Sequence, residues 1–436
     1  MKTYDIPLLI RGELITDHMT DHEARRGELR FRTPDVAKYL DRLPLTDPTR
    51  MSDMYEQLSF ADVVAYLDAL SERLDPASNP YLQEAYELSC LTSGLTPGIL
   101  HDAYARQIPG LLKADYVREV AELRIGVQAL DGWTRHELLD GRVAHTRPLG
   151  ARCVHITAGN SPGVAGITAL WNAITRGDAV IKSPSNDPLT SLAIGRTMID
   201  MAPDHPLTRH YSVAYWKGGN TELESRLYSP ENFEKVVAWG GFASMKHITR
   251  YLQPGLELVA MDPKLSARLE RLAEYTYEAL QQLVPHVSAP HPNFSPELRD
   301  EIDAIRSSSF YRVVGVEANL GGVIVSKIPD PVDFAGLLAC RVANFVPCDD
   351  IAEGLERITI HTQTIGVYPE SLKARYRDKL AFMGGQRIVS LGNHLTMTQS
   401  LPHDAMEPLR RLCRWINDED FTAGTYRGRV MFADQA

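Results

Sequence analysis

The strongest constraint on this chain is a regular alternation of short apolar strands and helices between residues 146 and 265. In order, the segments are "RPLGARCVHIT", "GVAGITALWNAITRG", "DAVIKS", "SNDPLTSLAIGRTMIDM", "HYSVAYWKGG" and "FEKVVAWGGF". Strands that alternate with helices in this way form a parallel, doubly wound sheet. Such a sheet binds ligands at the carboxyl ends of its strands, so we expect the site where "AGNSPG", "KSPS", "WKGG" and "WGGF" fall.

A glycine-bounded turn, "AGNSPG", joins the first of these strands to the first helix. Its glycines, Gly159, Gly163 and Gly166, are separated by three and then two residues, so the turn is neither a G-x-G-x-x-G fingerprint nor a Walker A loop. Lys182 leaves the next strand, and its ammonium can reach a ligand that lies over the turn. The combination favours a nucleotide or anionic cofactor over ordinary turn glycines.

Composition argues against several classes of partner. The chain has 436 residues, a net charge of -10 and a pI near 5.8, whereas nucleic-acid binding needs clustered Lys and Arg. We find no signal sequence, no apolar run near the ~18 residues of a membrane span, and no CxxC pair among five cysteines. His286 and His291 lack a Cys or carboxylate at ligand spacing. We therefore expect a reduced cytoplasmic protein with no membrane, nucleic-acid or metal partner.

Six motifs together resemble a known family. They are "ITAGNSPG", "IKSPSNDP", "VVAWGG", "DPKLS", "QTIGVYP" and "LPHDAMEPLRRLCRWI", spread over most of the chain. Their order is similar to that of the acyl-CoA reductases that include the fatty-acid reductase of bacterial bioluminescence, a branch of the aldehyde dehydrogenase superfamily. The resemblance implies an aldehyde-dehydrogenase-like α/β fold and NADPH-dependent reduction of an acyl thioester to an aldehyde. The acyl group would come from a thioester or from a partner synthetase.

The resemblance also assigns site residues by position. Gly159 borders the site, and Asn160 is the candidate donor to a developing oxyanion. Lys182 is expected to bond the adenosine ribose, and Gly240 with Gly241 to lie under the cofactor phosphates.

Ser185 refines the expected cofactor. The superfamily's Lys-x-x-Glu-x-x-Pro pattern uses its glutamate to hold the ribose hydroxyls of NAD, but this chain has Lys182, Ser185 and Pro188 at those positions. The serine removes a negative charge from the place of a 2'-phosphate, so NADPH is favoured over NADH.

The family's cysteine nucleophile is not found at its expected position. In the family, the Lys-x-Ser motif, here Lys264 to Ser266, continues through a further stretch to that cysteine. Here the chain passes directly into "ARLERLAEYTYEALQQLV", and no cysteine occurs between Cys153 and Cys340. The segment that carries the nucleophile is therefore predicted to be missing.

Other residues are weak substitutes. Cys340 is the candidate replacement nucleophile, with Cys348 as an equal alternative, although most buried thiols are inert. Cys153, within a strand, and Cys413, in an expected helix near the end, are interpreted as core thiols. Glu257 falls where aldehyde-oxidising relatives keep a general base, but a solvated carboxylate is at least as good an interpretation.

These expectations leave three functions open. The first is the acyl-thioester reductase, acting through a displaced cysteine or by direct hydride transfer. The second is a nucleophile-less homologue that ligates, transfers or condenses acyl groups without redox chemistry, and the third is a catalytically silent partner subunit.

The expected domains are an amino-terminal helical and oligomerisation region, a dinucleotide-binding domain, a shortened catalytic domain and a carboxyl-terminal segment, at residues 1–145, 146–265, 266–400 and 401–436. The protein is expected to be a homo-oligomer.

Overall fold

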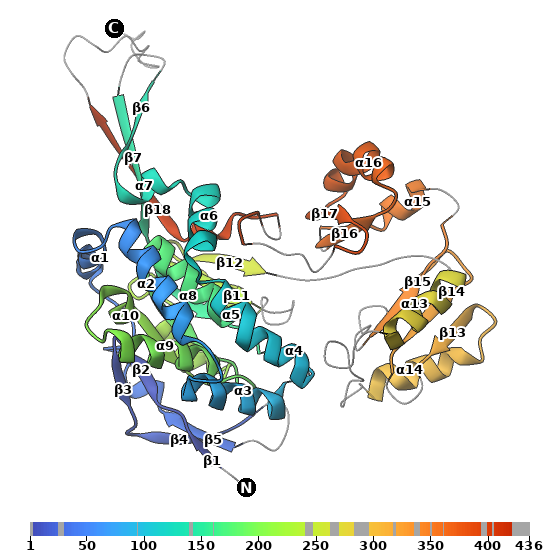
Figure 1. Ribbon diagram of the computed structural model, residues 1–436, viewed down its shortest axis with the longest axis horizontal. Coiled ribbons are helices and arrows are strands. Elements are labelled where there is room, and N and C mark those ends of the chain that lie inside the picture. Colours follow the sequence, from blue (N-terminus) through green and yellow to red (C-terminus); the bar gives the residue numbers. More distant parts are fainter. Residues whose placement is uncertain are drawn as a thin grey trace.

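The computed structural model shows a larger and a smaller lobe (Figure 1). The residues that it describes are 3–24, 30–93, 95–138, 143–159, 161–239, 247–261, 270–282, 296–316, 320–334, 341–348, 351–360, 362–393, 399–402 and 405–420. The smaller lobe contains the elements from α13 to β17, and the chain then returns to the larger lobe with α17 and β18.

A seven-stranded sheet forms the centre of the larger lobe. Its strands, in spatial order, are β12 (Glu257–Met261), β11 (Lys235–Trp239), β8 (Arg152–Ile156), β9 (Asp178–Lys182), β10 (Tyr211–Ala214), β2 (Leu8–Ile10) and β3 (Glu13–Ile15). The strands from β12 to β10 are parallel, and β2 and β3 extend the sheet antiparallel at the β10 edge. The doubly wound parallel sheet predicted from the sequence is confirmed.

The strand order reverses beside β8. The chain proceeds from β8 to β9 and β10 on one side, then returns to β11 and β12 on the other side. Open α/β sheets bind ligands at such a reversal, outside the carboxyl ends of the strands. The reversal places the ends of β8 and β11, at Ile156 and Trp239, next to each other.

Helices cover both faces of the sheet. On one face lie α2 (Phe60–Arg73), α8 (Gly163–Thr175) and α9 (Thr190–Met201), and on the other lies α11 (Thr221–Leu227). Every residue of α8 is buried, because α2 and α6 (Ala114–Arg124) cover the side that the sheet does not. This explains why the α8 sequence is apolar nearly all round.

The amino-terminal residues share the hydrophobic core of the sheet. One cluster joins Leu67 of α2 to Leu170 of α8 and Val237 of β11. The predicted boundary at residue 145 therefore does not separate two cores. The remaining elements here are β1 (Thr3–Asp5), β4 (Met19–Glu23), β5 (Arg30–Pro34), η1 (Val36–Lys38), η2 (Pro48–Ser52), α1 (Asp53–Glu56), α3 (Pro80–Thr92), α4 (Pro97–Asp102), η3 (Ala103–Gln107), α5 (Ile108–Gly110), α7 (Val127–Asp131), α10 (Pro206–Arg209) and η4 (Thr249–Tyr251).

An antiparallel arm projects from the larger lobe (Figure 1). It consists of β6 (Thr134–Glu137), β7 (Val143–Gly150) and β18 (Cys413–Asp420), with β7 in the middle. The expected helix around Cys413 was wrong: α17 (Pro408–Arg411) is a single turn, and Cys413 already pairs with Gly150 in the arm. The pairing with β7, which is distant in sequence, overrides the local helical pattern.

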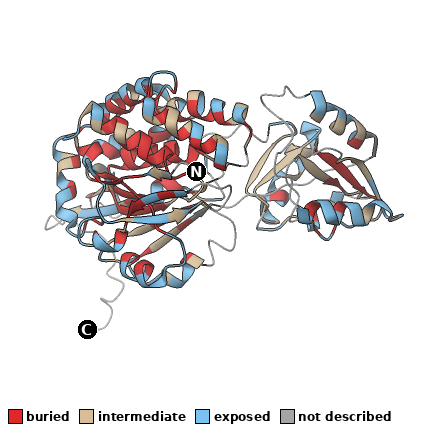
Figure 2. Cartoon of the chain, turned by 90° about the horizontal axis from the view of Figure 1, so that it is seen from below, coloured by how far each residue is buried: buried red, intermediate tan, exposed pale blue. Residues whose placement is uncertain are grey.

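The smaller lobe has two modest sheets. The strands β13 (Tyr311–Gly315), β14 (Gly322–Ser326) and β15 (Val342–Phe345) pack with α13 (Glu270–Gln282) and α14 (Pro296–Arg306). The strands β16 (Thr364–Val367) and β17 (Arg387–Ser390) pair beside α15 (Ile351–Glu356) and α16 (Glu370–Phe382). Buried residues are fewer here than in the larger lobe (Figure 2).

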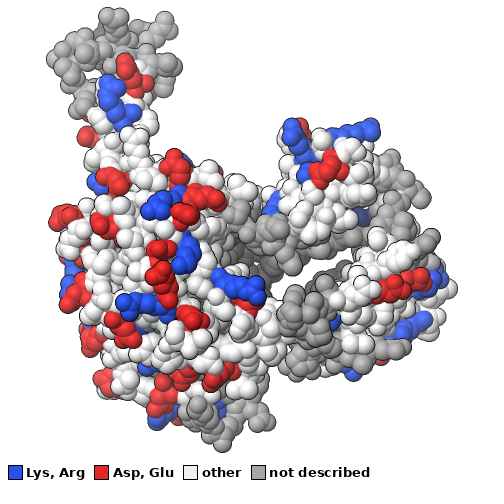
Figure 3. All heavy atoms as spheres, viewed as in Figure 1, with Lys and Arg blue, Asp and Glu red and all other residues white. Residues whose placement is uncertain are grey.

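Acidic and basic side chains are interspersed over the face of the larger lobe drawn in Figure 3. No helix within the described ranges has the length and apolar character needed to cross a membrane. In the same part of the chain, no three His, Cys, Asp or Glu side chains gather into a group that could hold a metal ion.

Candidate nucleotide and acyl site

The turn after β8 and the segment after β9 are joined at the carboxyl edge of the sheet. The backbone N–H and the hydroxyl of Thr157 both donate to the carbonyl of Lys182, at 3.2 and 3.0 Å. The side-chain amide of Asn186 donates to the carbonyl of Gly159 at 2.6 Å. A Cβ on Gly159 would lie 1.8 Å from Asn186 Oδ1, so glycine is what permits this approach. The turn and the strand that carries Lys182 therefore form one unit.

Lys182 ends β9 with its ammonium near two aromatic rings. Nζ lies 5.9 Å from the ring centroid of Tyr215 and 5.7 Å from that of Trp216, both of which follow β10. Burial lowers the pKa of Lys182 to about 8, and the negative charge of Glu224 opposes this shift. Lys182 is thus a partly desolvated cation at neutral pH, which a bound anion would stabilise.

Ser185 lies beside the same aromatic surface. It hydrogen-bonds with the hydroxyl of Tyr215, which opposes the rise that burial causes in the pKa of Tyr215. The hydroxyl of Ser183 is buried and has no hydrogen-bond partner among the described residues. The structure therefore brings three predicted residues, Gly159, Lys182 and Ser185, to one edge, together with a buried hydroxyl that is not satisfied by the described chain.

Two side chains at the strand reversal were not singled out from the sequence. Trp239 ends β11, and its ring centroid lies 5.4 Å from that of Trp171 in α8. His155 of β8 is fully buried, and burial lowers its pKa to about 3, so it is neutral. Neither the indole N–H of Trp239 nor the ring nitrogens of His155 have a partner in the described ranges. The available signal was a polar or aromatic residue near the end of an apolar strand.

Four predicted site residues lie outside the described residues: Asn160, Gly240, Gly241 and Cys340. Asn160 lies between Gly159 and Ser161, which are both described. Their assigned roles stay predictions.

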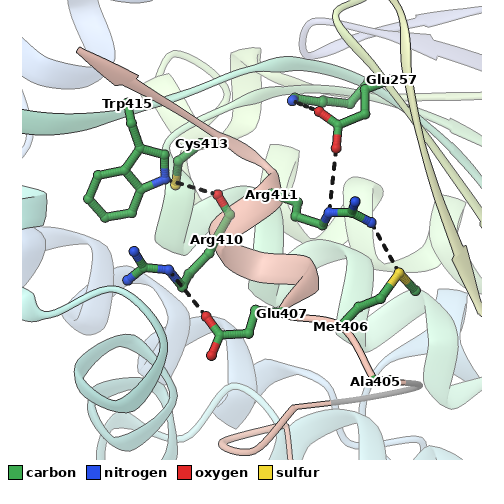
Figure 4. A pocket seen from close by; sticks show the side chains of 9 residues that line it. Glu257, Ala405, Met406, Glu407, Arg410, Arg411, Cys413 and Trp415 are labelled. Carbon is green, nitrogen blue, oxygen red and sulfur yellow. Dashed lines mark hydrogen bonds and ion pairs between the residues drawn. The ribbon is translucent and has the colours of Figure 1, made fainter. Parts of the chain in front are cut away.

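Glu257 lies at the opposite edge of the sheet from the turn. It is the first residue of β12, and its carboxylate pairs with Lys235 at 2.5 Å and with Arg411 at 3.4 Å. These groups line a pocket of about 550 Å³ (Figure 4). The full lining is Lys235, Glu257, Ala405, Met406, Glu407, Arg410, Arg411, Cys413 and Trp415. The structure therefore does not bring Glu257 together with Gly159 and Lys182, because parallel strands place it at their amino ends.

The described thiols of the larger lobe are not activated. Burial raises the pKa of Cys153 far above its usual range and that of Cys413 to about 12. Because the thiolate is the reactive form, both are unreactive at neutral pH, as expected for core thiols. Burial also raises the pKa of Cys90. Cys348, in the smaller lobe, is partly buried after β15.

Solved structures with the same fold are aldehyde dehydrogenases and a related enzyme. Lactaldehyde dehydrogenase from Escherichia coli has a TM-score of 0.69 and 13% identity, and covers 96% of this chain and 99% of its own. The NADP-dependent glyceraldehyde-3-phosphate dehydrogenase from Bacillus halodurans, solved with NADP, has a TM-score of 0.71 and 11% identity, with 95% and 99% covered. The predicted aldehyde-dehydrogenase-like fold is confirmed.

Sequence relatives carry a common name, long-chain acyl-protein thioester reductase. The protein from Vibrio harveyi is 26% identical over an alignment 463 residues long, gaps included, that covers 95% of this chain and 93% of the relative. The protein from Aliivibrio fischeri is 28% identical over 306 residues, which cover 61% of this chain and 63% of the relative. The chain thus matches less than two thirds of the second relative's length.

A family model described as Acyl-CoA reductase (LuxC) matches residues 107–282 and 309–415. These two stretches make up more than half of the chain, and they contain the turn at Gly159, Lys182 and Ser185. The resemblance inferred from the motifs is confirmed, and the chain belongs to the acyl-CoA reductase (LuxC) family.

Proposed function

We propose that this chain is an NADPH-dependent reductase that converts an acyl thioester to an aldehyde. The observation that carries the proposal is the unit formed by the Gly159 turn and Lys182 at the strand reversal, within a chain of this family. The name of the relatives supports an acyl thioester as the substrate class.

The residues at this edge fit a nicotinamide dinucleotide. Lys182 and the buried hydroxyl of Ser183 offer donors to ribose or phosphate oxygens, and Ser185 leaves room for a 2'-phosphate without a carboxylate to repel it. Gly240 and Gly241 are proposed to lie under the phosphates, as the family resemblance implies. Bound NADPH would supply the hydride that the thioester carbonyl carbon accepts.

The protein's own groups act on the thioester carbonyl and on the cofactor. We assign Asn160 as the hydrogen-bond donor to the carbonyl oxygen while that oxygen gains negative charge. When the carbonyl re-forms, the carbon–sulfur bond breaks, the thiol leaves with a proton from solvent, and the aldehyde is released. A thioester can follow this course without an acyl-enzyme because a thiolate is a good leaving group.

A second candidate is acyl transfer, ligation or condensation without redox chemistry. It is supported by the predicted absence of the family cysteine and by the raised pKa values of Cys153 and Cys413, which leave no activated thiol among the described residues of the larger lobe. A silent subunit would lack turnover altogether.

We further propose that a partner synthetase delivers the acyl group and that the protein acts as a homo-oligomer.

One experiment separates these functions. The protein is incubated with acyl-CoA of several chain lengths, with and without NADPH, and aldehyde, NADPH absorbance and protein mass are followed together. We expect aldehyde and NADP+ in equal amounts, and Lys182→Ala should raise the KM for NADPH at least about tenfold, because one charge-assisted contact contributes about 1.5 to 3 kcal/mol. The matched control is Lys379→Ala, an exposed lysine on α16 in the smaller lobe.

The alternatives have different outcomes. A product that forms equally well without NADPH would support the non-redox candidate, and an added protein mass would identify an acyl-enzyme. NADPH binding with no turnover at any chain length would contradict the reductase.

A further inference from the structure

Glu224 is a buried carboxylate on α11, near the nucleotide edge. Its side chain is only 3% exposed. One oxygen, Oε2, lies 2.7 Å from His247 Nε2, accepts from the Tyr251 hydroxyl at 3.0 Å and accepts from the Gly219 N–H at 3.3 Å. A carboxylate this deeply buried is costly unless it is hydrogen-bonded, and these three partners meet that need.

The three partners come from two separate segments of the chain. Gly219 lies in the turn after β10, with a φ of +90° that favours glycine, whereas His247 and Tyr251 belong to the segment that leads from β11 toward β12. In the sheet, β8 and β9 lie between β10 and β11. Glu224 therefore bridges segments that leave the sheet on either side of Lys182.

Glu224 also acts on Lys182 through its charge. Its negative charge raises the pKa of Lys182 against the effect of burial. The other titratable groups around this pair are Tyr215 beside Lys182, and His247, Tyr251 and Tyr228 around Glu224. Burial and the hydrogen bond to Glu224 both raise the pKa of Tyr251, so it remains a donor at neutral pH.

We propose that Glu224 is a positioning residue of the nucleotide site: its carboxylate holds the 247–251 segment at a set spacing from the Gly219 turn. This inference rests on the proposed binding of NADPH. Glu224 acts through Lys182 and the two segments and does not itself react. Its effect should therefore appear in cofactor affinity and in the pH dependence of that affinity, and not in the turnover rate at saturating cofactor.

The substitution Glu224→Gln separates charge from hydrogen bonding, because the amide oxygen still accepts from Tyr251 and Gly219. In the wild type, NADPH affinity should fall as pH rises through about 8, since Lys182 then loses its proton. In Glu224→Gln the midpoint of this fall should move down by about one pH unit, with kcat within about twofold, because a nearby opposite charge shifts a pKa by about this much. Affinity is measured by titrating protein fluorescence with NADPH from pH 6 to 9.5.

Two further variants make the test specific. Glu222→Gln removes the same charge from an exposed position on the same helix and should leave the midpoint unchanged. Glu224→Asp keeps the charge and should restore the wild-type midpoint within a few tenths of a pH unit. A second readout needs no NADPH. Lys182 is acylated with an added reagent at several pH values, and the extent of acylation is measured by peptide mass. In Glu224→Gln the pH midpoint of this acylation should shift in the same direction as the midpoint of NADPH affinity.

The outcomes distinguish this inference from the proposed function. In one outcome, NADPH still binds to Glu224→Gln with the same dependence of affinity on pH as in the wild type and Glu222→Gln. That result would overturn the inference and leave the proposed function standing. A wild-type protein that binds no NADPH at any pH would overturn the proposed function and this inference together. A shift of equal size in Glu222→Gln would show a general charge effect and would also overturn it.

Discussion

Asp178 shows how one residue can join distant parts of the chain. Its carboxylate is fully buried at the start of β9, paired with the guanidinium of Arg11 and 2.8 Å from His210 Nδ1. His210 Nε2 lies 3.0 Å from Asp53. Burial raises the pKa of Asp178, but Arg11 and His210 lower it more, so the net value is below the ordinary one. The pair therefore contributes stability at neutral pH, and this contribution is lost as pH falls through the lowered pKa.

Asp178→Asn should reduce the free energy of unfolding by about 3 to 5 kcal/mol at pH 7, because it leaves the Arg11 charge without its buried partner. The loss should shrink as pH falls through the pKa of Asp178, since the wild-type carboxyl is then also neutral. Chemical denaturation at several pH values measures this. The matched control is Asp5→Asn, which breaks an exposed pair with Arg32 and should leave the denaturation midpoint unchanged. Equal effects of the two substitutions would contradict the role given to Asp178.

At the scale of elements, the strand-to-helix turn after β8 depends on its contact with the segment after β9. The sequence "AGNSPG" predicts a turn, and the alternating pattern predicts its place at the carboxyl edge. Neither pattern predicts that the Asn186 side chain donates to the Gly159 carbonyl, because that contact joins residues that are far apart along the chain. Asp187 accepts from the Thr190 N–H at 3.2 Å, and this leaves the side chain of Asn186 available to the turn.

Gly159→Ala should displace Asn186 and break its hydrogen bond to the turn, since the added Cβ would meet the amide at 1.8 Å. We expect NADPH affinity to fall about five- to tenfold, which corresponds to the roughly 1 kcal/mol of one such bond. Titration by fluorescence measures this, with circular dichroism to verify folding. Gly132→Ala is the control, because a Cβ there meets nothing within 4 Å and the residue lies after α7, away from the turn. Unchanged affinity in Gly159→Ala would show that the turn is not part of the cofactor site.

At the scale of the whole molecule, the larger lobe is held by a core that the amino-terminal helices and the nucleotide sheet share. Leu67 of α2 is 1% exposed and belongs to the same cluster as Leu170 and Val237. The smaller lobe has separate clusters, one of which contains Leu298. The stability of the nucleotide site should therefore depend on the amino-terminal helices more than on the smaller lobe.

Leu67→Ala should reduce the stability of the larger lobe by about 2 to 5 kcal/mol, through lost burial and the cavity left behind. Hydrogen exchange read by mass spectrometry should show faster exchange in β8, β9 and β11 as well as in α2. Leu298→Ala, the control in the smaller lobe, should speed exchange only around α14 and its strands. If Leu67→Ala affected only residues 1–145, the two regions would have separate cores.

The candidate site residues show which positions local sequence patterns can predict and which they cannot. The apolar period and the turn residues identify Lys182 and Gly159 from local sequence, because strand ends and turns depend on neighbouring residues. Glu257 falls where aldehyde-oxidising relatives keep a general base, with a solvated carboxylate as an equal interpretation, and strand direction places it at the amino edge with Lys235 and Arg411. Glu224 gave no sequence signal, because its partners lie in two other segments.

The sequence by itself determined the doubly wound sheet and the family, since strand and helix periods and short motifs are local properties. The tertiary structure alone decided that residues 1–145 share the core of the sheet, that Cys413 joins the arm and that Glu224 joins the Gly219 turn to the 247–251 segment. Each of these depends on contacts between segments that are distant in the chain, which form only when the whole fold buries its apolar surface.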